Sequence, residues 1–141
     1  MKSSNLKTFG YPTILLAALT MLYGFWLVIF PLKTAEPTKQ PYKVLTYKVA
    51  AGDTFKYEVG LCKYNNAPGT LTRQLVGPEL VFVDSEPSSL PMGCTTAIRA
   101  VPLPKSITPG KYKMVISIKY NVNVLHTVSL VFQTEEFEIM K

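Results

Sequence analysis

The chain has 141 residues, of which 48% are hydrophobic and 17% charged, with 15 Lys and Arg against 9 Asp and Glu. This length indicates one domain, since domains typically hold roughly 100–200 residues. The apolar content excludes a disordered tail and a collagen, and two cysteines are too few for a disulfide-dense miniprotein. The composition therefore indicates a folded protein and leaves its activity open.

The N-terminal segment is apolar enough to cross a membrane. Residues 14–30 contain nothing more polar than Thr20, and no Asp or Glu precedes Lys33. With its flanks the segment covers residues 11–32, and these 22 residues would form a helix of about 33 Å. A hydrocarbon core is about 30 Å thick. We therefore predict a transmembrane helix over residues 11–32 that contacts membrane lipid, with residues 1–10 as a short cytoplasmic tail.

A cleaved secretory signal is the competing interpretation. Such a signal has an apolar region of about 7–15 residues, followed by small residues at a cleavage site. Here the run is longer and ends at Phe30-Pro31-Leu32-Lys33, and the small-residue candidate, Ala35, has Lys33 two positions before it. An uncleaved signal anchor is therefore favoured over cleavage near residue 36, and also over a buried helix of a soluble protein.

The orientation of the chain does not follow from counting lysines, because they flank both sides of the apolar segment. Long domains are translocated largely regardless of their charge, and the short N-terminal tail holds no acidic residue. We expect a single-pass protein of the inner (cytoplasmic) membrane whose C-terminal domain lies outside the cytoplasm, in a periplasmic or similar compartment.

The rest of the chain has the pattern of a linker and a β-domain. Residues 33–41 are polar and hold two prolines, which is typical of a short extended spacer. From Tyr42 onward, hydrophobic and polar residues alternate, most clearly over residues 54–61, 111–120, 128–132 and 137–139. Such alternation indicates strands with one buried face. Turn-forming residues separate seven or eight such strands, which predicts an all-β domain over residues 42–141, an antiparallel β-sandwich, with a small closed barrel as the alternative.

The run Ile107-Thr108-Pro109-Gly110-Lys111-Tyr112-Lys113-Met114 resembles the tyrosine corner of immunoglobulin-like sandwiches. The resemblance implies an immunoglobulin-like fold, of the kind carried as an ectodomain on a single membrane anchor in bacteria or phages. It also implies that Tyr112 is the structural corner tyrosine, whose hydroxyl bonds to nearby backbone. Met114 stands where antibody domains carry their second cysteine, and no tryptophan follows Trp26.

Cys62 and Cys94 are the two cysteines of the chain. Thirty-one residues lie between them, so they form no CxxC redox motif, and one histidine cannot complete a four-ligand zinc site with them. In an exported domain such a pair most naturally forms a disulfide, whereas a domain facing the cytoplasm would keep two reduced thiols. We expect the disulfide, joining the end of one strand to a loop or the start of a later strand.

No arrangement of residues indicates an enzyme, a cofactor or a metal site. His126 is the single histidine, the serines follow no Gly-x-Ser-x-Gly pattern and the glycines are scattered. The acidic cluster near residue 136 has the pattern of a solvated strand and supplies too few oxygen ligands for calcium. Chemistry at Cys62 or His126 is a minor alternative.

Candidate partner contacts fall on one strand and two loops. Lys111, Lys113 and Lys119 share a face of the strand predicted over residues 111–120, either to contact an anionic partner or, as we favour, as a solvated face or protection for an edge strand. Loops at residues 61–67 and 85–93 are the expected recognition surfaces. The first loop carries Tyr64, which is either an interface residue or a half-buried strand end.

These observations predict a membrane-anchored, extracytoplasmic β-sandwich that acts through protein–protein interaction. We expect it to be an accessory or structural component of an envelope or phage-related assembly, with a protein partner of unknown identity. Two arginines are too few to indicate a nucleic-acid surface. The alternative is a secreted or periplasmic domain that binds a glycan or another anionic ligand.

Overall fold

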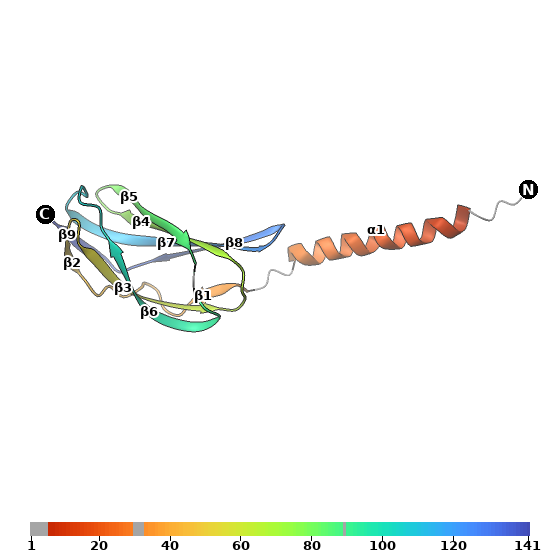
Figure 1. The fold of residues 1–141 in the computed structure, drawn as a ribbon, viewed down its shortest axis with the longest axis horizontal. Coiled ribbons are helices and arrows are strands. Elements are labelled where there is room, and N and C mark those ends of the chain that lie inside the picture. Colours follow the sequence, from red (N-terminus) through yellow and green to blue (C-terminus); the bar gives the residue numbers. More distant parts are fainter. Residues whose placement is uncertain (1–5, 30–32, 89) are drawn as a thin grey trace, which may run out of the picture.

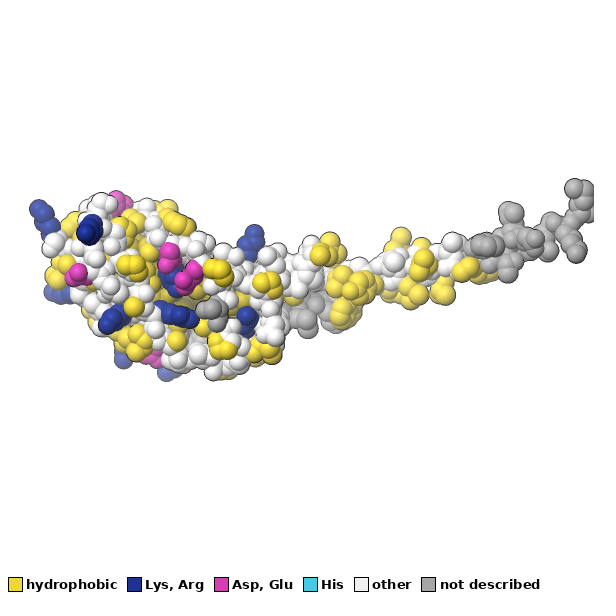
Figure 2. All heavy atoms as spheres, in the orientation of Figure 1, with side chains coloured by type: hydrophobic (Ala, Val, Ile, Leu, Met, Phe, Trp, Pro, Cys, Tyr) yellow, Lys and Arg dark blue, Asp and Glu magenta, His cyan; other side chains and the backbone are white. Residues whose placement is uncertain are grey.

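A long N-terminal helix, α1 (Leu6–Ile29), extends away from a body made of strands (Figure 1). The computed structural model describes residues 6–29, 33–88 and 90–141. Apolar side chains make up much of the helix surface where it is described (Figure 2), and its segment Tyr11–Val28 is long and apolar enough to cross a membrane, a property that signal sequences share. The helix begins within the predicted tail, because nothing in residues 6–10 stops a helix. Residues 30–32, the end of the predicted span, lie outside the described residues.

The described part of the chain after the helix forms two sheets that pack as a sandwich. The smaller sheet has the order β1-β3-β6, and the larger has the order β2-β9-β7-β4-β5, with β8 also paired to β7. Each pairing is antiparallel except the parallel pair of β2 and β9. This confirms the predicted immunoglobulin-like antiparallel β-sandwich in place of the barrel. The strands are β1 (Ala35–Pro37), β2 (Lys48–Ala50), β3 (Thr54–Lys63), β4 (Gly69–Val76), β5 (Leu80–Pro87), β6 (Gly93–Pro102), β7 (Gly110–Asn123), β8 (His126–Gln133) and β9 (Phe137–Met140).

The core lies between the inner faces of the long strands β3 and β7. Every second residue of β7 from Tyr112 to Tyr120 is buried, and the residues between them are exposed or half-buried. Phe55 of β3 stacks on Phe137 of β9 with 3.9 Å between the ring centroids. Because side chains alternate between the two faces of a strand, this inner packing also fixes which residues face outward.

The predicted linker over residues 33–41 is wrong, because the sandwich begins before Tyr42. Residues 35–37 form β1, which pairs with the end of β3, and Ala35 is 6% exposed. The chain then closes one side of the sandwich: Thr38 donates its N–H to the Gly60 carbonyl at 3.0 Å, and Tyr42 donates its N–H to the Gln133 carbonyl at 2.8 Å. These are backbone contacts, which need no alternation of side chains and so leave no periodic signal in the sequence.

The corner contact implied by the resemblance is present at Tyr112. This side chain is 1% exposed, and its hydroxyl donates to the Thr108 carbonyl at 2.8 Å. We expect Tyr112→Phe to lower the free energy of unfolding by about 1 kcal/mol, because one hydrogen bond is lost. Tyr120→Phe is the control, since the buried Tyr120 hydroxyl has no hydrogen-bond partner among the described residues. Urea unfolding of both variants checks the prediction, and equal losses would contradict it.

Candidate interaction surface

The outer face of the larger sheet carries apolar side chains on four neighbouring strands, exposed on β4, β5 and β8 and half-buried on β7. In the strand register, Val76 of β4 lies between Leu80 of β5 and Lys113 of β7. One row further along, Gln74 lies between Phe82 and Val115. We call the apolar members of this face the outer-face patch: Val76, Leu80, Phe82, Val115 and Val131.

Four of the five members of the outer-face patch are exposed, and Val115 is half-buried. Leu80 is 70% exposed, Phe82 is 59% and Val131 is 57%. The sequence Leu80-Val81-Phe82-Val83 explains how this arises, because Val81 and Val83 point inward and pack against the core while the other two point outward. Sequence reasoning missed this patch. The signal available in the sequence was the run of four apolar residues at positions 80–83, because a strand places every second one of them on its outer face.

The three lysines predicted to share one strand face do so, and they lie around the outer-face patch. Lys111, Lys113 and Lys119 are exposed on the outer face of β7. Their strand is not an edge, since β7 pairs with β4 on one side and with β8 and β9 on the other. Protection of an edge strand is therefore the wrong explanation for them. Lys111 also has a local partner, with its Nζ 3.4 Å from Oε1 of Glu136.

An open groove of about 790 Å³ adjoins the outer-face patch where β8 passes into β9. The carboxylate of Glu135 accepts hydrogen bonds from the Tyr47 hydroxyl at 2.7 Å and from the Val44 N–H at 3.0 Å. Both hydrogen bonds, and chiefly the one from the Tyr47 hydroxyl, lower the pKa of Glu135 below its ordinary value. The residues that line the groove are Gln40, Pro41, Lys113, Val131, Gln133, Thr134, Glu135 and Glu136.

Tyr64 lies apart from the outer-face patch, at the end of the body nearest the helix. Its N–H donates to the Thr34 carbonyl at 2.9 Å, its hydroxyl donates to the Glu36 carboxylate, and Lys33 Nζ lies 5.0 Å from its ring centroid. Although it is 44% exposed, Tyr64 is held by the chain that follows the helix. Both predicted recognition loops, residues 61–67 and 85–93, lie at this end, because β3 ends and β6 begins there (Figure 1). Residue 89 of the second loop lies outside the described residues.

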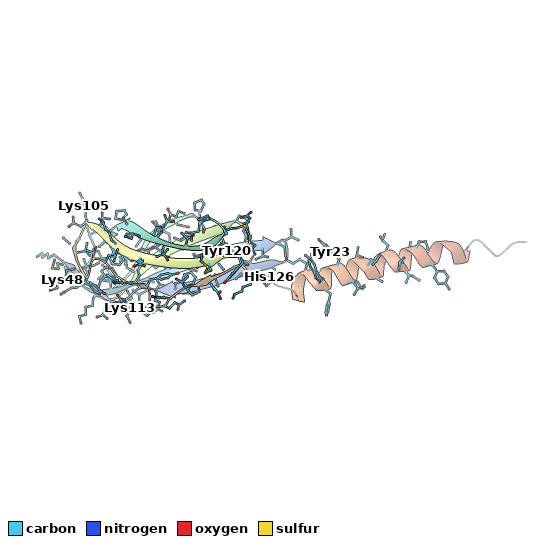
Figure 3. All side chains as sticks on the ribbon, turned by 90° about the horizontal axis from the view of Figure 1, so that it is seen from below. Tyr23, Lys48, Lys105, Lys113, Tyr120 and His126 are labelled. Atoms are coloured by element: carbon cyan, nitrogen blue, oxygen red, sulfur yellow. A yellow bond between two sulfur atoms is a disulfide. The ribbon has the colours of Figure 1, made fainter. Side chains whose placement is uncertain are left out.

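His126 also lies at this end of the body, at the start of β8, while Lys48 and Lys105 lie at the far end (Figure 3). It is half-buried. Within residues 6–29, 33–88 and 90–141, no three His, Cys, Asp or Glu side chains are grouped closely enough to hold a metal ion.

The predicted disulfide is present between Cys62 and Cys94. The two residues face each other across β3 and β6, and their sulfur atoms are 2.08 Å apart. Cys62 is buried and Cys94 is exposed. The bridge therefore lies within the smaller sheet, on its outer face and near the helix, rather than between the two sheets.

No family model matches the chain, and no curated protein matches it in sequence. Solved structures match it in fold. The C-terminal domain of wzt superposes with a TM-score of 0.52 at 10% identity, over 79% of this chain and 77% of that one. A CARDB domain from Pyrococcus furiosus, solved in complex with di-metal ions, has a TM-score of 0.45 at 12% identity, over 79% of this chain and 93% of that one. At such low identity the first similarity shows a common β-sandwich fold and nothing about ligands.

Proposed function

We propose that this chain is a single-pass membrane protein whose β-sandwich binds another protein outside the cytoplasm, through the outer-face patch. The patch carries the proposal. A contiguous apolar surface rimmed by polar residues is typical of a protein–protein interface, whereas single exposed apolar residues are ordinary on any surface. Here Leu80 and Phe82 of β5 adjoin Val76 of β4 on one sheet face. Val131 of β8 lies on the same face across β4 and β7, and lysines of β7 lie beside these residues.

Two further features support the location of this function. A helix that is apolar around its whole circumference is stable when lipid or protein surrounds it, and the segment Tyr11–Val28 is not buried in the body. Disulfides persist in oxidising compartments and are rare in the cytosol. The Cys62–Cys94 bridge therefore favours a β-domain outside the cytoplasm, with the tail of the chain on the cytoplasmic side.

The charges near the outer-face patch favour a protein partner over a glycan or another anionic polymer. Lys111 is paired with Glu136, and the groove beside the patch carries Glu135 as well as Lys113. An anionic polymer would meet these carboxylates next to the lysines, whereas a protein surface can offer both signs of charge. We infer that the sandwich is an accessory subunit that holds a protein partner at the membrane, within an envelope or phage-related assembly.

Site-specific photo-crosslinking in intact cells tests this function. We expect a photo-crosslinking amino acid at Val131 to yield one discrete protein adduct, because Val131 is an exposed member of the outer-face patch. Phe82→Asp should abolish that adduct without lowering the melting temperature, since Phe82 is 59% exposed and lies three strand spacings away, about 14 Å.

The matched control is Ile98→Asp, which places the same charge at an exposed apolar residue of the other sheet. Ile98 is 66% exposed on β6. The Val131 adduct should persist in this variant. Loss of the adduct in both variants, or its persistence in both, would contradict the assignment of the interface to the outer-face patch.

A further inference from the structure

The turn between β7 and β8 is apolar and reaches toward the helix. Asn123 pairs with His126, which leaves Val124 and Leu125 as the two residues of the turn. Val124 is 94% exposed and Leu125 is 62% exposed. Figure 1 shows this hairpin extending from the body on the side where α1 lies.

Turn formation does not account for the choice of these two residues. Two-residue hairpin turns favour Asn, Asp and Gly, because their backbone commonly requires positive φ angles. Among the described residues no residue other than glycine has a positive φ, so the turn uses an ordinary backbone. It is closed by the Asn123 side chain, whose Oδ1 accepts the Leu125 N–H at 2.9 Å. Polar residues would serve at positions 124 and 125, yet both are apolar and face outward.

The same asparagine joins the turn to the helix. Its Nδ2 donates to the Leu27 carbonyl at 3.4 Å, and this carbonyl lies in the last turn of α1, where carbonyls have no partner within the helix. One residue earlier in the helix, Trp26 packs against Tyr23 with their ring centroids 6.3 Å apart. Trp and Tyr concentrate where a bilayer meets water. The turn therefore lies at the depth of these aromatic residues.

We propose that Val124 and Leu125 insert into the same bilayer that α1 crosses, in the leaflet on the side of the β-domain. This inference rests on the membrane anchoring proposed above. Its basis is continuity: the apolar turn adjoins the apolar surface of the helix, so a bilayer around the end of the helix also meets the turn. The sandwich is then held at two points, and the outer-face patch keeps a fixed orientation to the membrane.

Tryptophan quenching by brominated lipids tests the insertion. The full chain has a single tryptophan, Trp26, so Trp26→Phe combined with Leu125→Trp moves the reporter to the turn. In phosphatidylcholine vesicles brominated on the upper acyl chain, we expect this variant to lose emission to about the extent that the unaltered protein does, with a blue-shifted maximum. Trp26→Phe with Leu80→Trp is the control, because Leu80 is equally apolar, 70% exposed and at the far end of the body. It should keep its emission.

The outcomes separate this inference from the anchor. Quenching of Trp26 in the unaltered protein without quenching of the Leu125→Trp variant would overturn the insertion alone. Absence of quenching at Trp26 would overturn the anchor and the insertion together. Equal quenching of the Leu80→Trp control would also overturn the insertion, since the body would then lie on the membrane as a whole. Val124→Trp supplies a second reporter if Leu125→Trp lowers the melting temperature.

Discussion

Arg73→Met is expected to lower the free energy of unfolding by about 3 kcal/mol. Arg73 is 4% exposed on the inner face of β4, and its guanidinium donates to the Tyr57 hydroxyl at 3.2 Å, to Asp84 at 2.7 Å and to Glu86 at 2.6 Å. Removing one member of a buried ion pair commonly costs about 3–5 kcal/mol, because the remaining charge loses its compensation. The Asp84 and Glu86 side chains are 35% and 51% exposed, so water can solvate them in part, which places the loss at the lower end.

Arg99→Met is the matched control for this effect. Arg99 is half-buried on β6 and forms no ion pair among the described residues, so we expect a loss below about 1 kcal/mol. The double variant Arg73→Met/Asp84→Leu should recover part of the stability, because it also removes the uncompensated carboxylate. Equal losses for Arg73→Met and Arg99→Met in urea unfolding would show that the ionic cluster contributes nothing beyond packing.

Part of the ionic cluster around Arg73 was predictable from the sequence. Leu71, Arg73 and Leu75 alternate on β4, and this period places an arginine on the buried face. Its acidic partners were not readable, because β5 has a register shift opposite Arg73 and Gln74, which interrupts the regular pairing of the two strands. The pairing register between two strands is set by tertiary packing, and the alternation of apolar and polar residues within one strand does not reveal it.

The fold itself was predictable where one face of a strand is buried and the other is exposed to solvent. β7 is the clearest case, since its alternation from Tyr112 to Tyr120 matches the observed burial residue by residue. The site was less predictable. The outer-face patch combines β4, β5, β7 and β8, so its members become neighbours only once the strand order is known. The loops expected to bind a partner instead lie beside the helix, and this position likewise depends on the topology.

Removing the disulfide with Cys62→Ser/Cys94→Ser is expected to lower the free energy of unfolding by about 3–4 kcal/mol. The cysteines are 32 positions apart, and the intervening chain includes β4 and β5 of the other sheet, so the bridge restricts a long loop in the unfolded chain. For a domain of about 100 residues this corresponds to a melting temperature lower by about 15–25 °C. Thermal unfolding followed by circular dichroism in non-reducing buffer measures the difference.

The effect should be largest at the helix-proximal end of the body. Among the strands of the described residues, β6 pairs only with β3, and the bridge joins residues near the end of that pairing, where Gly93 faces Lys63. Without the bridge, amides of β6 near Gly93 should exchange hydrogen faster than amides near Val101, which is 1% exposed and lies toward the far end of the strand. Reductant should lower the melting temperature of the unaltered protein to that of the serine variant, and should leave the variant unchanged. An unaltered melting temperature under reducing conditions would show that strand pairing alone holds this end of the smaller sheet.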